Sequence, residues 1–373
     1  MKSIICSLSL LICFAAAAQE PAAITSKADE IITRVGERLV PDRRLGVFAA
    51  TAELHGDTLF VRGETTAPGA CDSLLTALSA ASLLPVRCEI EQLPETRLGD
   101  RCVGVITVST ALLRSGPSEK EEIINQALLG ETFTLLKDTH YFDLVQLSDG
   151  YVGYIDGGST AVMSRSELDA WESRHKVIFW KKWGEIRSEK NNQSIPVSDI
   201  VLGNSVTLVR REGKWLRVAL ADGREGYLRH DEVIEAEKFA RQPRPTPAQL
   251  AATARQFTGY PYLWGGRSIK GFDCSGFTLT VYKLHGITLP RDANMQVFAG
   301  REVPVDSSYS ALQPGDLLFF GRTRSTITHV GMYIGGYRFI HSGDLVLVNS
   351  FNPAHPDFAP RRARDLQAVR RIL

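Results

Sequence analysis

The sequence predicts an α+β protein made of several domains, and three observations lead to this prediction. The chain has 373 residues, two to three times the usual length of one domain. Residues 129–155 are repeated at 202–228, and both copies carry the alternation typical of strands. After a proline-rich connector, the pattern changes to helices followed by strands, which favours helices packed on an antiparallel sheet.

These observations divide the chain into consecutive parts. After a leader at residues 1–18, we expect a stabilising N-terminal domain at 19–103. Two small all-β barrels are expected at 104–170 and 171–240, and a C-terminal α+β domain at 241–373.

The composition is that of an ordinary globular protein, with 44% hydrophobic and 23% charged residues. The 43 Lys and Arg residues nearly balance the 42 Asp and Glu residues, so no broad positive field exists for a polyanion. We therefore expect a ligand that is recognised locally and no nucleic-acid partner.

The segment at 1–18 has the pattern of a secretory signal peptide. Lys2 precedes an apolar run at 4–14, and small residues lead to an expected cleavage after Ala18. A lipid anchor on Cys13 is the alternative, disfavoured because Ile12 stands where a lipoprotein signal has a small residue. The run is too short to span a membrane, so we expect an exported, periplasmic or secreted protein without a transmembrane segment.

Four cysteines follow this leader. Two of Cys71, Cys88 and Cys102 are expected to form a disulfide in an oxidising compartment, and the sequence leaves the pairing open. Cys274 stands alone, far along the chain from Cys102, as either a buried apolar residue or a reactive thiol.

Local patterns predict further elements along the chain. A helix is expected at 72–84, and each repeat copy is expected to form strands joined by an Asp-Gly turn. After the connector at 241–249, Thr246 and Pro247 have the pattern of an N-cap and first helical residue. Strands are expected at 316–320, 328–334, 337–341 and 345–350.

Cys274 is predicted to open a helix. Glycines precede it, and the apolar residues Phe277, Val281 and Leu284 follow at helical spacing until Gly286. Free N–H groups and the positive end of the helix dipole favour a thiolate there, so we expect a lowered pKa for Cys274 and a nucleophilic role.

Two histidines on predicted strands are candidates for the partner that a thiol nucleophile needs. His329 is the expected base, Gly331 is expected to leave room for substrate beside its imidazole, and His341 is expected to fix its tautomer. A zinc site from Cys274 and these histidines is disfavoured, because the spacing of the three resembles no compact metal motif. We expect no metal and no cofactor.

Several motifs in order resemble the NlpC-type (NlpC/p60) cysteine peptidases, papain-like enzymes that cut cell-wall peptides. They are GYPYLWGG, GFDCSGF, LPRDANMQ, QPGDLLFF, HVGMYIG and FIHSG, spread over most of the C-terminal domain. The resemblance implies a catalytic set of Cys274, His329 and His341, with the Tyr262 hydroxyl as a donor to the oxyanion. The barrels resemble bacterial Src-homology-3-like domains.

The whole arrangement resembles secreted γ-D-glutamyl-L-diamino-acid endopeptidases that recycle or trim murein peptides. The resemblance implies that Asp273, together with Glu122 and Tyr154 of the first barrel, recognises the free amine of an N-terminal L-Ala. Tyr154 has a repeat counterpart in Tyr227, so a role in barrel packing is equally compatible with the sequence. The remaining implied substrate-binding residues are Ser275, Arg291 and Asp292. Ala293 departs from the small hydroxyl residue of many relatives, which leaves one hydrogen bond missing or supplied by Asn294.

We therefore expect a hydrolase whose partner is a murein stem peptide, cleaved between γ-D-Glu and the diamino acid. One alternative is a wall-binding module with an inert peptidase domain. Another is a cell-wall amidase or cross-link endopeptidase of the same fold. The sequence does not define the diamino acid or the oligomeric state.

Overall fold

The computed structural model describes residues 21–81, 84–306 and 308–373. The predicted signal peptide, with Cys13, lies outside the described residues. The chain forms two compact units, one made of residues up to 43 together with 47–92, the other of Arg44–Gly46 and Leu93–Leu373.

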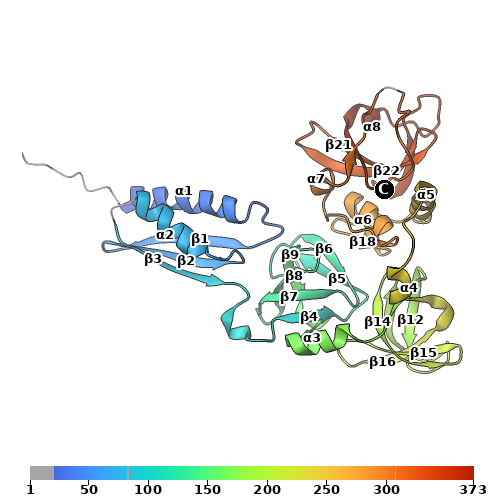
Figure 1. Ribbon diagram of the computed structural model, residues 1–373, viewed down its shortest axis with the longest axis horizontal. Helices are drawn as coiled ribbons and strands as arrows, with labels where there is room; N and C mark the ends of the chain where they lie inside the picture. The colour runs from blue at the N-terminus through green and yellow to red at the C-terminus, as the bar shows by residue number, and fades with distance from the viewer. Residues whose placement is uncertain (1–20, 82–83, 307) are drawn as a thin grey trace, which may run out of the picture. The chain divides into compact units, whose positions relative to one another are not determined.

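In the N-terminal unit, two helices lie on one face of a three-stranded sheet (Figure 1). The strands β1 and β2 form an antiparallel hairpin, β3 runs parallel to β2, and Leu59, Val61 and Leu74 lie in the core between sheet and helices. A disulfide joins Cys71 to Cys88, which answers the pairing that the sequence left open. The elements are α1 (Pro21–Leu39), β1 (Phe48–His55), β2 (Thr58–Thr65), α2 (Ala70–Ala81) and β3 (Val86–Gln92).

The two copies of the repeat form two seven-stranded sheets with antiparallel pairing throughout. The strands predicted from the repeat are confirmed as β7, β8 and β9 in the first sheet and β14, β15 and β16 in the second. The first sheet has the order β10-β4-β7-β8-β9-β5-β6 and the second the order β13-β12-β16-β15-β14-β11-β17. The first contains β4 (Val103–Ile106), β5 (Thr110–Arg114), β6 (Ile123–Leu128), β7 (Thr132–Lys137), β8 (Phe142–Leu147), β9 (Val152–Asp156) and β10 (Thr160–Met163). After α3 (Arg165–Glu172), the second contains β11 (Lys176–Phe179), β12 (Trp183–Arg187), β13 (Pro196–Val201), β14 (Ser205–Glu212), β15 (Trp215–Ala219), β16 (Glu225–Arg229) and β17 (Val233–Glu235), followed by α4 (Ala236–Ala240).

The C-terminal part packs helices on a six-stranded sheet of order β20-β25-β21-β22-β23-β24, as the predicted α+β class requires. Its first helix begins where expected, because Thr246 and Gln249 form a reciprocal capping box around Pro247. The four predicted strands are confirmed as β21 to β24. The elements are α5 (Pro247–Arg255), β18 (Arg267–Ser268), β19 (Gly271–Phe272), α6 (Cys274–Lys283), α7 (Ala293–Gln296), β20 (Arg301–Glu302), β21 (Leu317–Gly321), β22 (Ile327–Gly335), β23 (Arg338–Ser342), β24 (Val346–Ser350), α8 (Pro360–Asp365) and β25 (Leu366–Arg371).

Both faces of this sheet are covered. Val330 and Met332 of β22 pack with Phe277 of α6 in one core cluster. On the other face, Phe320 and Tyr333 belong to a second cluster, against which side chains of α8 pack. The catalytic candidates on β22 and β23 therefore lie in a largely dry environment.

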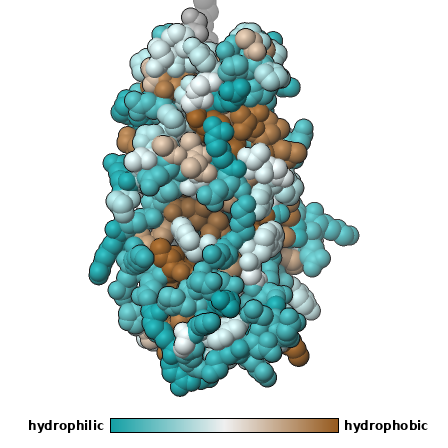
Figure 2. Space-filling model, turned by 90° about the vertical axis from the view of Figure 1, so that its right-hand side faces the viewer, coloured by the Kyte–Doolittle hydropathy of each residue, from teal (hydrophilic) through white to brown (hydrophobic). Residues whose placement is uncertain are grey.

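Hydrophilic side chains dominate the face of the molecule in Figure 2, with small apolar areas between them. Among the described residues, no helix is long and apolar enough to cross a membrane.

Candidate functional site

Helix α6 begins at Cys274 because the preceding residue caps it. The Asp273 side chain accepts a hydrogen bond from the Gly276 backbone N–H at 2.7 Å, while the Asp273 N–H donates to the Gly266 carbonyl at 2.9 Å. A Cβ on residue 276 would lie 2.0 Å from the Gly266 oxygen, so only glycine permits this contact. The predicted position of Cys274 at a helix start is confirmed.

The predicted lowering of the Cys274 pKa is wrong. Burial and the Asp273 carboxylate raise the pKa of the thiol to about 11, and the backbone N–H groups of Val330 and Ser275 oppose this only partly. The helix end does favour a thiolate, but its cap is an anion directly beside the sulfur. The resting Cys274 side chain is therefore a neutral thiol, which would need a base to act as a nucleophile.

The two histidines form a hydrogen-bonded chain that ends on an asparagine. His329 Nε2 lies 2.9 Å from His341 Nδ1, and His341 Nε2 lies 2.9 Å from Asn349 Oδ1. The Asn349 amide is oriented by its Nδ2, which donates to the Asp357 carbonyl at 3.4 Å. Since Oδ1 only accepts, His341 carries its proton on Nε2, and His329 must donate from its own Nε2.

This chain leaves Nδ1 of His329 as a proton acceptor when the ring is neutral. His329 is 8% exposed and His341 is 4% exposed. Burial lowers the pKa of His341 to about 4 and lowers the pKa of His329 well below its usual value. Both rings are therefore neutral near pH 7, which is the state a general base requires.

Gly331 serves a different purpose from the one predicted. A Cβ at residue 331 would lie 3.0 Å from His341 Cβ and 3.2 Å from the Ile340 oxygen. The space beside Gly331 is filled by the second histidine, so the glycine permits close approach of β22 and β23 rather than entry of substrate.

Tyr262 is fixed close to Cys274 by backbone pairing. Its N–H donates to the Asp344 carbonyl at 3.1 Å, and it forms a parallel bridge with Phe272, two residues before Cys274. Burial, with the charges of Cys274 and Asp273, raises the pKa of Tyr262 to about 12. Its hydroxyl stays protonated and can donate a hydrogen bond, as an oxyanion donor must.

Three residues predicted to bind substrate are hydrogen-bonded to one another. Arg291, 2% exposed, donates to both carboxylate oxygens of Asp273 and to Ser275 Oγ at 3.1 Å. Its Nε also donates to Asn125 Oδ1 at 2.7 Å, a residue of β6 in the first barrel. The Arg291 guanidinium therefore already neutralises the Asp273 carboxylate. The prediction that Asp273 binds a substrate amine did not take this partner into account.

The first barrel also reaches this region through Tyr151. The Tyr151 hydroxyl donates to Asp292 Oδ2 at 3.1 Å, and Arg44 donates to the same oxygen at 2.6 Å and to Asn294 Oδ1 at 2.8 Å.

The other two predicted amine-binding residues belong to the first barrel. Tyr154 is half-buried within β9, opposite Leu144 of β8, and Glu122 is exposed before β6. The repeat distinguishes Tyr154 from Tyr151. Tyr154 matches Tyr227, as a barrel-packing residue would, whereas Tyr151 aligns with Arg224 and has no tyrosine counterpart.

Charged side chains join the first barrel to the C-terminal part. Arg267, 5% exposed, donates to Glu131 at 2.6 Å, and its N–H donates to Gln126 Oε1 at 2.9 Å. Lys283 also pairs with Glu131. Burial alone would raise the pKa of Glu131, but the two cations lower it to about 2. This junction holds β6 beside the segment that carries Cys274.

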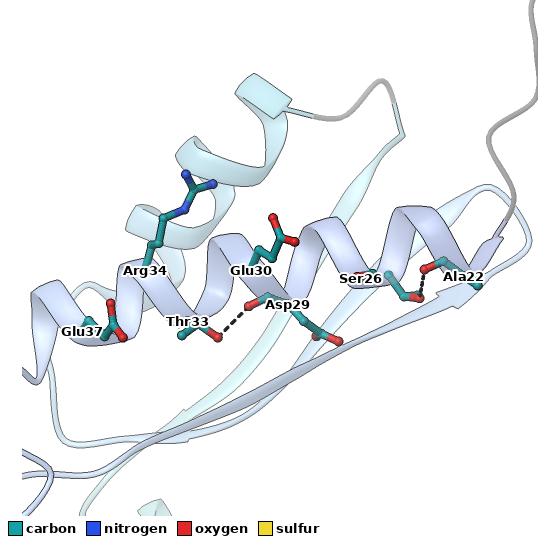
Figure 3. Close-up of a pocket in the computed structure, with 8 residues that line it drawn as sticks. Ala22, Ser26, Asp29, Glu30, Thr33, Arg34 and Glu37 are labelled. Carbon is teal, nitrogen blue, oxygen red and sulfur yellow. Dashed lines mark hydrogen bonds between the residues drawn. The ribbon is translucent and has the colours of Figure 1, made fainter.

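A separate surface hollow lies along α1, and Figure 3 shows its lining. Its side chains include Asp29, Glu30 and Arg34, and Thr33 donates to the Asp29 carbonyl at 2.8 Å. The lining contains neither cysteine nor histidine. In the described ranges, no three His, Cys, Asp or Glu side chains gather in a way that could hold a metal ion.

Comparisons with known proteins match the parts that carry this geometry. Residues 259–358 match the NlpC/P60 family, and residues 113–158 match the bacterial dipeptidyl-peptidase Sh3 domain. The γ-D-glutamyl-L-lysine dipeptidyl-peptidase of Bacillus subtilis is 33% identical over 46% of this chain and 54% of its own length. The chain thus spans about half of that relative.

Two further proteins are similar over more of their length. Dipeptidyl-peptidase 6 of Lysinibacillus sphaericus is 27% identical over 71% of this chain and 97% of its own length. The crystal structure of an NlpC/P60 family protein from Bacillus cereus superposes with a TM-score of 0.62 and 27% identity, covering 73% of this chain and 99% of its own. The chain therefore contains an NlpC/P60 domain and a bacterial dipeptidyl-peptidase Sh3 domain, as the sequence motifs predicted.

Proposed function

We propose that this protein is a cysteine peptidase that hydrolyses murein stem peptides between γ-D-Glu and the following L-diamino acid. The observation that carries the proposal is the chain from Asn349 through His341 to His329, which presents a neutral imidazole as base in the domain that holds Cys274. The names of the Bacillus subtilis and Lysinibacillus sphaericus relatives support a dipeptidyl-peptidase, and the name of the first supports action on a γ-D-glutamyl bond.

The proposed mechanism begins with a proton transfer. His329 takes the proton of the Cys274 thiol as the sulfur attacks the γ-carbonyl of D-Glu, because a thiol with a raised pKa is a weak nucleophile until it is deprotonated. The Tyr262 hydroxyl donates to the tetrahedral oxyanion. His329 then protonates the departing amine, and water, deprotonated by the same imidazole, releases L-Ala-D-Glu from the thioester.

Recognition of a free N-terminal amine rests on Asp292 in this proposal. Asp273 is already paired with Arg291, whereas Asp292 keeps a 24% exposed side chain at the junction with the first barrel. In these two pairs, each carboxylate is matched by one guanidinium. A substrate ammonium gains Asp292 only by displacing Arg44, which makes Arg44 a competitor for the amine.

The test of the activity is cleavage of L-Ala-γ-D-Glu-meso-diaminopimelate by the full chain, followed by mass spectrometry. We expect L-Ala-D-Glu and free diaminopimelate as products, and no cleavage by Cys274→Ala. Cys102→Ala is the matched control, since Cys102 is the other free cysteine of the described chain. Release at the alanine or at a cross-link would instead indicate an amidase or a cross-link endopeptidase, and unchanged activity of Cys274→Ala would refute the mechanism.

The test of amine recognition compares this peptide with its N-acetylated form. We expect the acetylated peptide to be cleaved poorly, Asp292→Asn to reduce that discrimination, and Arg44→Ala to lower KM for the free amine. Equal kcat/KM for the two peptides would refute amine recognition.

We propose that the protein acts outside the cytoplasm. The apolar leader and the Cys71–Cys88 disulfide both favour an oxidising compartment. N-terminal sequencing of the protein from a cell-envelope fraction tests this, with Gln19 as the expected first residue.

A further inference from the structure

Helix α8 places a guanidinium beside the catalytic groups. The Arg362 side chain is half-buried, and its Cζ lies 5.4 Å from the centre of the Phe320 ring. That ring lies 5.8 Å from the ring of His329, and the two residues face each other across β21 and β22. Arg362 is thus one aromatic ring away from the imidazole that serves as base.

The charge of Arg362 acts on the whole catalytic group. After burial, it is among the causes that lower the pKa of both His329 and His341. Burial and the neighbouring Arg361 lower the pKa of Arg362, whereas the charges of Cys274 and Asp365 raise it. The ring contacts and these mutual effects together place the guanidinium within electrostatic range of both histidines and of Cys274.

Arg362 differs from its neighbours on α8 because it has no acidic partner within ion-pair distance. Arg361 and Arg364 each lie 3.5 Å from Asp365. Arg362 forms no hydrogen bond or ion pair with any of the residues that the structure describes. A half-buried guanidinium loses hydration without a compensating acceptor, so a ligand anion would be bound favourably there.

We propose that Arg362 binds a carboxylate of the diamino acid that leaves during cleavage. This inference rests on the proposed function. His329 delivers its proton to the α-amine of that residue, so the atoms next to this amine pass close to Arg362. Two carboxylates have the required chemistry: the α-carboxylate of a C-terminal diamino acid, and the side-chain carboxylate that diaminopimelate has and lysine lacks.

The experiment measures kcat/KM of the full chain on four peptides. They are L-Ala-γ-D-Glu-meso-diaminopimelate, L-Ala-γ-D-Glu-L-Lys, and the C-terminal α-amide of each. The variants are Arg362→Gln, Arg362→Lys and the matched control Arg361→Gln, which removes a positive charge from the same helix. A fifth peptide with D-isoglutamine in place of D-Glu reports on the carboxylate of the acyl part.

We expect the wild type to prefer one kind of carboxylate by about 10- to 100-fold, the range of a charge-assisted hydrogen bond. If the side chain is bound, diaminopimelate is preferred over lysine; if the α-carboxylate is bound, the acids are preferred over the amides. Arg362→Gln removes that preference, Arg362→Lys keeps part of it, and Arg361→Gln keeps it all.

Other outcomes overturn the inference. They are an equal effect of Arg362→Gln on all peptides, no effect on any, or an effect that depends only on D-isoglutamine. If the wild type cleaves none of the peptides, the proposed function fails, and this inference fails with it.

Discussion

Replacement of Asn349 by leucine tests the proton chain of the histidines most directly. The substitution keeps the side-chain volume similar but removes the only acceptor that the structure gives to His341 Nε2. The buried N–H would then lack a partner, at a cost of about 1–3 kcal/mol. His341 avoids this cost by moving its proton to Nδ1, where it faces His329 Nε2.

The switch of one ring forces a switch of the other. If His341 donates from Nδ1, His329 must accept at Nε2 and carry its proton on Nδ1, so it cannot accept the thiol proton. A cost of about 1–3 kcal/mol leaves roughly one molecule in 5 to one in 150 in the competent arrangement. We therefore expect kcat/KM of Asn349→Leu to fall by about 5- to 150-fold, through kcat rather than KM.

The assay is peptide hydrolysis at pH 7.5, together with ¹⁵N NMR of the histidine side chains, which reports the tautomers directly. Asn349→Asp is the control, because its carboxylate also accepts from Nε2 and should keep the wild-type tautomers. If Asn349→Leu keeps wild-type kcat and wild-type tautomers while folding normally, the proton-chain argument is wrong.

Three further predictions concern acid–base chemistry and stability. Because burial lowers the pKa of His329, the imidazole stays neutral as the pH falls. As the pH is lowered, kcat/KM should therefore decline with a midpoint below pH 6.5. A midpoint above pH 7 would contradict this prediction. Arg291→Met leaves the Asp273 carboxylate buried without its cation, so it should lower the free energy of unfolding by about 3–5 kcal/mol, measured by urea denaturation. The double change Arg291→Met and Asp273→Ala should recover part of the loss. Replacing both Cys71 and Cys88 by serine should destabilise the N-terminal unit by about 3 kcal/mol, because the disulfide joins positions 17 residues apart. Peptide hydrolysis should persist, since the candidate site lies in the other unit. Loss of hydrolysis in a folded variant would contradict that assignment.

The features that the sequence predicted well depend on local patterns. The strands of both barrels follow from an alternation at 129–155 that recurs at 202–228, and the start of α6 follows from the residues around Cys274. The histidines on β22 and β23 follow from the resemblance and from strand periodicity. Each of these signals lies within a short stretch of sequence, where period and capping determine structure.

The features that the sequence missed depend on contacts between distant segments. Arg44 meets Asp292 across 248 positions, and no local pattern marks that pair. The prediction for the Cys274 pKa was wrong because the helix dipole can be read from sequence, whereas burial of the sulfur cannot. Asn349 has a common residue type on an ordinary strand, and only its orientation toward His341 distinguishes it.

The ionic junction at Glu131 also limits how the first barrel can be exchanged during evolution or engineering. Arg267 and Lys283 of the C-terminal part neutralise Glu131, and Arg291 donates to Asn125 of the same barrel. A C-terminal domain expressed alone would keep Arg267 without this acid and Arg291 without one of its acceptors. Grafting this NlpC/P60 domain onto another barrel therefore requires that β6 and its following turn be carried along.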